Sequence, residues 1–146
     1  MNQKMNPLYL IAKVYNLSNE EVFKTRLLIE KIIAELAAQN ATDENIAEIS
    51  DELVEMFYKS DSPEEYLAHS IKFHQKIAAA TGNRLLIAIH NMLFPILKDY
   101  ISPESLAENN IKATTKSNQN IFKAIKNRNS LVAGQLMHEH LTSSRF

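Results

Sequence analysis

Two polar residues, Ser70 and His74, occupy positions where the sequence otherwise predicts the buried face of a helix. The apolar residues Ile71, Ile77 and Ala78 recur around them at three- and four-residue spacing, which places Ser70 and His74 one turn apart on the side facing the core. A buried hydroxyl and a buried imidazole both need hydrogen-bond partners. The pair is therefore either a histidine satisfied by its neighbours inside a helical core or one wall of a ligand pocket between helices.

Arg26 is a positively charged residue near the buried face of a second predicted helix. It follows Val22 by four residues and precedes Ile29 by three, so it lies close to the apolar stripe of the helix that contains all three. An arginine there can be a structural ion-pair partner or a snorkelling side chain. It can also grip a ligand carboxylate through two parallel hydrogen bonds.

Three further polar residues extend the candidate ligand site. Asn118 precedes Ile121 by three residues and shares its inward face, and His140 lies on the apolar side of the last helix, whereas His138 is expected to point outward. Asn83 follows Gly82 at the beginning of another helix. The residues predicted to bind a ligand are thus Arg26, Ser70, His74, Asn83, Asn118 and His140.

The composition predicts one compact domain and excludes several functional classes. The chain has 146 residues, 45% of them hydrophobic, and a formal charge of −1, which argues against DNA contact by this chain alone. There is no cysteine, so a metal would need histidine and oxygen ligands. Without a long apolar run or a signal-peptide pattern, we expect a cytoplasmic protein with no membrane partner.

Helix signals recur along the whole chain and predict an all-α antiparallel bundle of six or seven helices. Residues 1–17 are expected to be a lead-in or linker that docks on a main domain at residues 18–146. Expected helix starts are a capping box at Ser18 with Glu21, and caps at Thr42, Ser62 and Ser102, followed by a last helix from about Ser130.

The same periodicity predicts which side chains face the core. The apolar positions expected to face inward in the first two long helices are Val22, Ile29, Ile32, Ile33, Leu36, Ala37, Ile46, Ile49, Leu53, Met56 and Phe57. Gly82 is expected in a left-handed conformation at a helix end, and Pro95 is expected to kink its helix near Asn91. No inward-facing acid is evident from the pattern.

Five segments in this order and at these spacings resemble the FCD domain, the effector-binding and dimerisation domain of the FadR branch of GntR-family bacterial transcription regulators. The resemblance covers about residues 18–142. The segments are residues 22–30 (VFKTRLLIE), residues 37–44 (AAQNATDE), Phe73-His74 with Gly82-Asn83, residues 121–125 and residues 137–141.

The resemblance implies a metal-binding pocket, because many members of this family hold a divalent metal through one Asp and three His. The corresponding positions here are Ser70, His74, Asn118 and His140, so two of the four ligands have changed. His74 and His140 could contribute to a weak zinc or nickel site. The changes remove the anionic ligand and one imidazole, however, and His69 lies about 140° round its helix from His74. We therefore expect a polar pocket without a firmly bound metal.

The resemblance also implies a function: a domain that senses a small carboxylate effector, with Arg26 as the gripping residue. Such a domain forms a homodimer and controls DNA binding by an N-terminal winged helix-turn-helix, for which residues 1–17 are too short. Two other interpretations stay open. One is a stand-alone structural dimer module whose pocket has decayed. The other is a metal-dependent helical-bundle enzyme, which the missing carboxylate and Glu-x-x-His ligands disfavour. We therefore do not expect this protein to be an enzyme.

Overall fold

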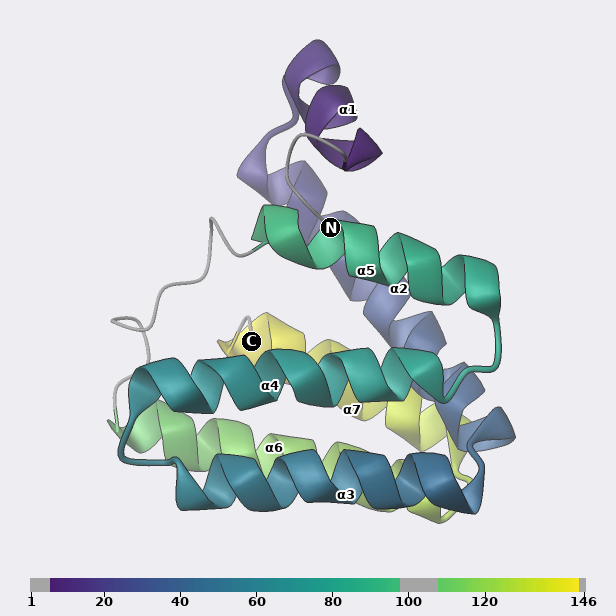
Figure 1. Cartoon of the computed structure of the whole chain (residues 1–146), viewed down its shortest axis with the longest axis vertical. Coiled ribbons are helices and arrows are strands. Elements are labelled where there is room, and N and C mark those ends of the chain that lie inside the picture. Colours follow the sequence, from purple (N-terminus) through teal and green to yellow (C-terminus); the bar gives the residue numbers. More distant parts are fainter. Residues whose placement is uncertain (1–5, 98–107, 145–146) are drawn as a thin grey trace.

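A computed structural model describes residues 6–97 and 108–144. Within these residues the chain forms seven helices and no strands, which confirms the predicted all-α bundle (Figure 1). The helices are α1 (Pro7–Tyr15), α2 (Asn19–Asn40), α3 (Asp43–Tyr58), α4 (Pro63–Ala79), α5 (Arg84–Leu97), α6 (Glu108–Lys126) and α7 (Ser130–Ser144). None of the helices in these two described ranges is long and apolar enough to cross a membrane.

The bundle is organised around α2, which packs along α7 and also contacts α4, α5 and α6. Two antiparallel pairs, α3 with α4 and α6 with α7, complete the body, and α6 also lies against α3 (Figure 1). The main core lies between these helices and is formed by aliphatic and aromatic side chains such as Ile33, Ile49, Phe73, Ile121 and Met137. This arrangement directs one face of each of five helices, α2, α4, α5, α6 and α7, toward the interior.

Most of the predicted helix ends are present. Ser18 and Glu21 form the expected capping box, in which Ser18 Oγ accepts from Glu21 N at 3.1 Å and Glu21 Oε2 accepts from Ser18 N at 2.9 Å. Gly82 has a φ of 68°, the left-handed conformation that was expected after α4. At Ser62 the prediction was wrong in part: Pro63 is the first residue of α4, but the serine side chain makes no capping hydrogen bond.

Two of the predicted inward residues are exposed. Ile32 is 49% exposed and Phe57 is 63% exposed. On α3 the buried face follows Ile49, Leu53 and Met56, and Phe57 lies about 100° further round the helix than Met56. At the end of α3, Phe57 packs edge-on against the exposed Tyr58 instead, with ring centroids 5.8 Å apart.

The lead-in segment contains a helix that the sequence did not clearly indicate. Asn6 caps α1 by accepting from Leu8 N, and its Nδ2 donates to Met92 O at 2.8 Å, while Tyr9 Oη donates to Pro95 O at 2.9 Å. These bonds attach α1 to α5, and α1 stands at one end of the bundle (Figure 1). Pro95 lies inside α5, and the kink expected there stays a prediction. The helix start expected at Ser102 lies outside the described residues.

Candidate functional site

Five of the six predicted ligand-binding residues are buried. Arg26 on α2, Ser70 and His74 on α4, Asn118 on α6 and His140 on α7 are each at most 2% exposed. His138, in contrast, is exposed, as expected. The three- and four-residue spacings therefore predicted the inward direction of these five side chains correctly. These residues come from four helices that are far apart in the sequence.

A row of rings connects three of these residues. The imidazoles of His74 and His140 are stacked, with centroids 5.8 Å apart and planes inclined by 26°. Phe94 of α5 lies next to His74 at 6.1 Å, and the Arg26 guanidinium carbon lies 5.4 Å from the centroid of the Phe94 ring. A cation at that distance from an aromatic ring is within the range of favourable cation–π attraction. The row thus links α2, α5, α4 and α7 inside the bundle.

Two ionisable residues that the sequence reading missed belong to the same group. Glu30, one helical turn after Arg26, is 1% exposed, and His90 of α5 is fully buried. Glu30 Oε2 lies 2.9 Å from His74 Nδ1, and Glu30 Oε1 is in close contact with His90 Nε2. The expectation that the interior holds no acid was therefore wrong. We call Arg26, Glu30, Ser70, His74, His90, Asn118 and His140 the buried polar cluster.

The signal for both missed residues was present in the helical spacing. Glu30 continues the buried series of Val22 and Arg26 at intervals of four, and His90 precedes Phe94 by four. Because charged side chains are almost never fully buried unless they are paired, the residue type alone predicts that a glutamate at such a position is exposed. The pairing partners come from α4 and α5, and only the tertiary structure reveals them.

Electrostatics in the cluster depends on these contacts. Burial alone raises the pKa of the Glu30 carboxyl, but the charges and contacts of His90 and His74 outweigh burial and hold its pKa well below the usual range. For Arg26, burial lowers the pKa of the guanidinium, and the negative charge of Glu30 opposes that shift. Glu30 therefore supplies a resident negative charge in the middle of the bundle.

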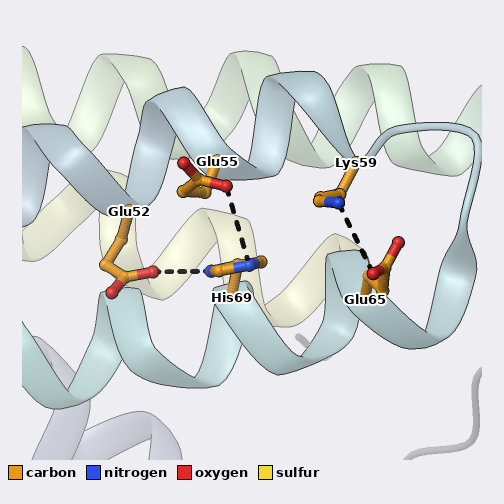
Figure 2. A network of polar contacts seen from close by, with 5 residues as sticks. All are labelled: Glu52, Glu55, Lys59, Glu65 and His69. Atoms are coloured by element: carbon orange, nitrogen blue, oxygen red, sulfur yellow. Dashed lines mark hydrogen bonds and ion pairs between the residues drawn. The ribbon is translucent and has the colours of Figure 1, made fainter.

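Asn83 and His69 lie outside the cluster. Asn83 is exposed, and its Oδ1 accepts from Leu86 N at 3.0 Å at the start of α5, so the structure does not bring it together with the other five predicted residues. His69 lies on the side of α4 that faces α3, where Nδ1 is 2.8 Å from Glu52 Oε2 and Nε2 is 4.0 Å from Glu55 (Figure 2). The expectation that His69 faces away from the His74 side of the helix is confirmed.

The donor set does not fit a tightly bound metal ion. At two of the four expected positions, Ser70 and Asn118 offer a hydroxyl and an amide, which are poor ligands for zinc or nickel. Glu30 contacts His74 and His90 through different oxygens. Across residues 6–97 and 108–144, no three His, Asp or Glu side chains are arranged to hold one ion.

A surface depression reaches the cluster from the α6 and α7 side. It has a volume of about 220 Å³ and is lined by Ser117, Asn120, Leu136, Glu139, His140 and Ser143. His140 therefore lines the depression and also stacks on His74 inside the bundle. It is the residue through which the cluster borders the surface.

Comparison with known proteins identifies relatives along most of the chain. The family model of the FCD domain matches residues 21–143. The HTH-type transcriptional repressor NanR of Klebsiella aerogenes is 29% identical over 121 residues, which is 81% of this chain and 46% of NanR. NanR of Edwardsiella tarda is 27% identical over the same shares. The chain thus spans about half the length of these relatives.

Two solved structures have the same fold. GntR of Streptococcus agalactiae superposes with a TM-score of 0.69 at 24% identity, over 86% of this chain and 56% of that protein. McbR/YncC of E. coli also has a TM-score of 0.69, at 17% identity, over 84% of this chain and 60% of that protein. At these identities the likeness establishes the arrangement of helices.

Proposed function

Because this chain belongs to the FCD domain family of GntR-type transcription regulators, we propose that its buried polar cluster binds a small carboxylic acid and that this binding controls a DNA-binding regulator. The observation that carries the proposal is the cluster itself. It contains one guanidinium, one carboxylate and three imidazoles from four helices, and each of the five side chains is at most 2% exposed. Burying so many ionisable groups costs free energy, which a ligand site would explain.

In this proposal Arg26 binds the carboxylate of the ligand. A guanidinium presents parallel N–H groups that match a carboxylate, and burial strengthens the attraction because water is excluded. His74, His140, Ser70 and Asn118 would donate or accept the remaining hydrogen bonds. Binding needs no metal in this scheme, since side chains supply all the contacts.

The depression beside His140 supports a route for the ligand. Its volume of about 220 Å³ accommodates a small organic acid, and His140 is the residue that it shares with the cluster. A ligand that moves inward from there must displace the His140 ring from its stack on His74. Ligand entry would therefore shift α7 relative to α4, and such a shift is a means of transmitting binding to the rest of a regulator.

The proposal places the chain within a larger dimeric regulator. The relatives are named as transcriptional repressors and are about twice as long as this chain, so DNA binding is assigned to a part of the regulator outside the FCD domain. Dimerisation is supported by exposed apolar side chains on α1, where Leu10, Val14 and Tyr15 are 66%, 68% and 73% exposed.

Thermal-shift titration with small carboxylic acids tests the ligand proposal. A ligand at a hundred times its dissociation constant adds about 2.7 kcal/mol to the free energy of unfolding, so saturable stabilisation by an acid is expected. Arg26→Met should abolish the shift, whereas Lys24→Met should leave it unchanged, because Lys24 is exposed and forms an exposed ion pair with Glu20 on the same helix. A chelator should have no effect on the shift.

The competing interpretation is a structural dimer module without a ligand. It predicts that no acid stabilises the wild-type protein, although light scattering after size-exclusion chromatography still shows a dimer. A monomer at high protein concentration would contradict both interpretations. Stabilisation by zinc or nickel that is lost in His74→Ala would contradict the metal-free scheme.

A further inference from the structure

Helix α1 is held on the bundle through two backbone carbonyls of α5. Asn6 Nδ2 donates to Met92 O at 2.8 Å, and Tyr9 Oη donates to Pro95 O at 2.9 Å. The carbonyl of Pro95 is one of the last four in α5, which have no partner inside their own helix. The two bonds therefore hold the turn of α5 that contains its proline from the side of α1 (Figure 1).

The helical state of α1 depends on this attachment. α1 has nine residues, none of them buried, and helices this short are marginal in water without tertiary packing. Its N-cap is Asn6, whose Oδ1 accepts from Leu8 N at 3.1 Å while Nδ2 donates to α5. One side chain, only 3% exposed, thus both caps α1 and fixes it to α5. A movement of α5 would act directly on the start of α1.

The same turn of α5 forms a wall of the buried polar cluster. His90 contacts Glu30 through Nε2, and its ring lies 4.6 Å from the ring of Phe94, one turn later. Phe94 in turn lies beside Arg26, whose guanidinium carbon is 5.4 Å from the ring centroid. Residues 90–95 therefore present side chains to the cluster and backbone carbonyls to α1.

A small apolar group distinct from the main core completes the attachment of α1. Three buried residues form this group, Val22, Leu93 and Ile96, and Leu8 and Tyr9 of α1 pack against them. Because the main core lies elsewhere in the bundle, we expect α1 to detach without opening that core. The docking of α1 is then a local equilibrium that is separate from global unfolding.

From these contacts we infer that α1 and the buried polar cluster are coupled through α5, with Asn6 and Tyr9 as positioning residues. When α1 is docked, its two hydrogen bonds hold the turn of His90 and Phe94 against the cluster. When that turn moves, the bonds break, and α1 loses its cap and its helical state. As a means of regulation, the inference rests on the proposed function, in which ligand binding displaces side chains of the cluster. The coupling acts equally in both directions, because linkage is reciprocal.

Two substitutions loosen α1 without altering a side chain of the cluster. Tyr9→Phe removes one donor to α5, and Asn6→Asp removes the other while keeping an acceptor for the cap. Amide hydrogen exchange in α1 should become at least about fivefold faster in each variant, as expected for the loss of one hydrogen bond. The exposed controls Tyr58→Phe and Asn19→Asp make the same chemical changes elsewhere and should leave the exchange of α1 unchanged.

The histidine rings distinguish coupling from simple detachment of α1. In Tyr9→Phe the NMR signals of the His90 ring should shift, because the turn that carries it is no longer held. The signals of His69, which lies on the α3 side of α4, should stay in place. In the reverse direction, Glu30→Gln should accelerate the exchange of α1 about fivefold or more under conditions where global unfolding is rare, and Glu52→Gln should not.

The outcomes separate this inference from the proposed function. Faster exchange of α1 in Tyr9→Phe with unshifted His90 signals would overturn the coupling, and so would unchanged exchange in that variant. Unchanged exchange of α1 in Glu30→Gln with wild-type circular dichroism would also overturn it; if Glu30→Gln does not fold, the result in Tyr9→Phe decides. Coupling in a protein that no acid stabilises would leave the inference standing and reject the carboxylate site.

Discussion

Helix α4 carries two histidines that each contact a glutamate at nearly the same distance, and they differ in burial. His74 lies 2.9 Å from Glu30 with both side chains 1% exposed, and His69 lies 2.8 Å from Glu52 with side chains 21% and 16% exposed. Replacing each glutamate by glutamine removes the same charge from the same kind of pair. We expect Glu30→Gln to destabilise the fold far more than Glu52→Gln.

The magnitudes follow from what each substitution leaves behind. Without the Glu30 charge, the buried imidazoles of His74 and His90 lose the carboxylate that they contact, and breaking buried ionic contacts of this kind costs about 3–5 kcal/mol. In Glu52→Gln, water can solvate the His69 imidazole near the surface, so the expected loss of stability is about 1 kcal/mol or less. A domain is stable by only about 5–15 kcal/mol in total, so the first variant should lose a large part of its stability.

Urea unfolding followed by circular dichroism measures the difference at neutral pH. The midpoint of Glu30→Gln should fall sharply at an unchanged slope, and that of Glu52→Gln should stay close to the wild type. Equal losses of unfolding free energy in the two variants would refute the reasoning. They would show that burial does not determine how much these contacts contribute to stability. A gain in stability for Glu30→Gln would show that the buried charge costs more than its contacts return.

Four further predictions concern stability in acid, stability in alkali and two glycines of the backbone. The pKa of Glu30 is lowered in the folded state, so the Glu30 charge contributes fully to stability at a pH above the pKa of the unfolded state. That contribution is lost as the pH falls through the pKa of the folded state. Unfolding of Glu30→Gln measured as a function of pH should lack this loss in acid. Burial raises the pKa of Tyr66 to about 12, so stability should fall as the pH rises above about 10, and Tyr66→Phe should remove that part of the alkaline loss in the same assay. Gly82→Ala should cost about 1 kcal/mol in urea unfolding from backbone strain alone, because φ is 68° and no atom lies within 4 Å of an added Cβ; no loss would mean that the left-handed turn relaxes. Gly134→Ala should destabilise, since its Cβ would lie 2.5 Å from Glu35 Cγ, but in a Glu35→Ala background it should stabilise by about 1 kcal/mol.

Much of this fold is predictable from local patterns. The capping boxes, the glycine at the end of α4 and the three- and four-residue spacing of apolar side chains each depend on a few neighbouring residues. The same spacing identified Arg26, His74 and Asn118 as buried, because one face of a helix is set by its own sequence. Phe57 shows the limit of this reasoning, since near a helix end an apolar residue can lie just outside the covered face.

The candidate site was predictable only in part. His90 and Glu30 were missed because a charged group is buried only where a distant partner compensates for it, and no local pattern contains that partner. Asn83 was included because it lies at the mouth of a helix, yet its side chain is used to cap α5. Inward direction can therefore be read from the sequence, but pairing between helices cannot.

The stack of His140 on His74 has a consequence for how the protein folds. It joins the last helix to the middle of the chain, and through Glu30 to α2, so the cluster closes only after segments separated by nearly the whole sequence have met. Contacts of such high contact order form late, and until then the ionisable groups keep their hydration. We therefore expect the closing of the bundle to strip water from Glu30 and its histidines, and this dehydration to contribute to the barrier between the folded and unfolded states.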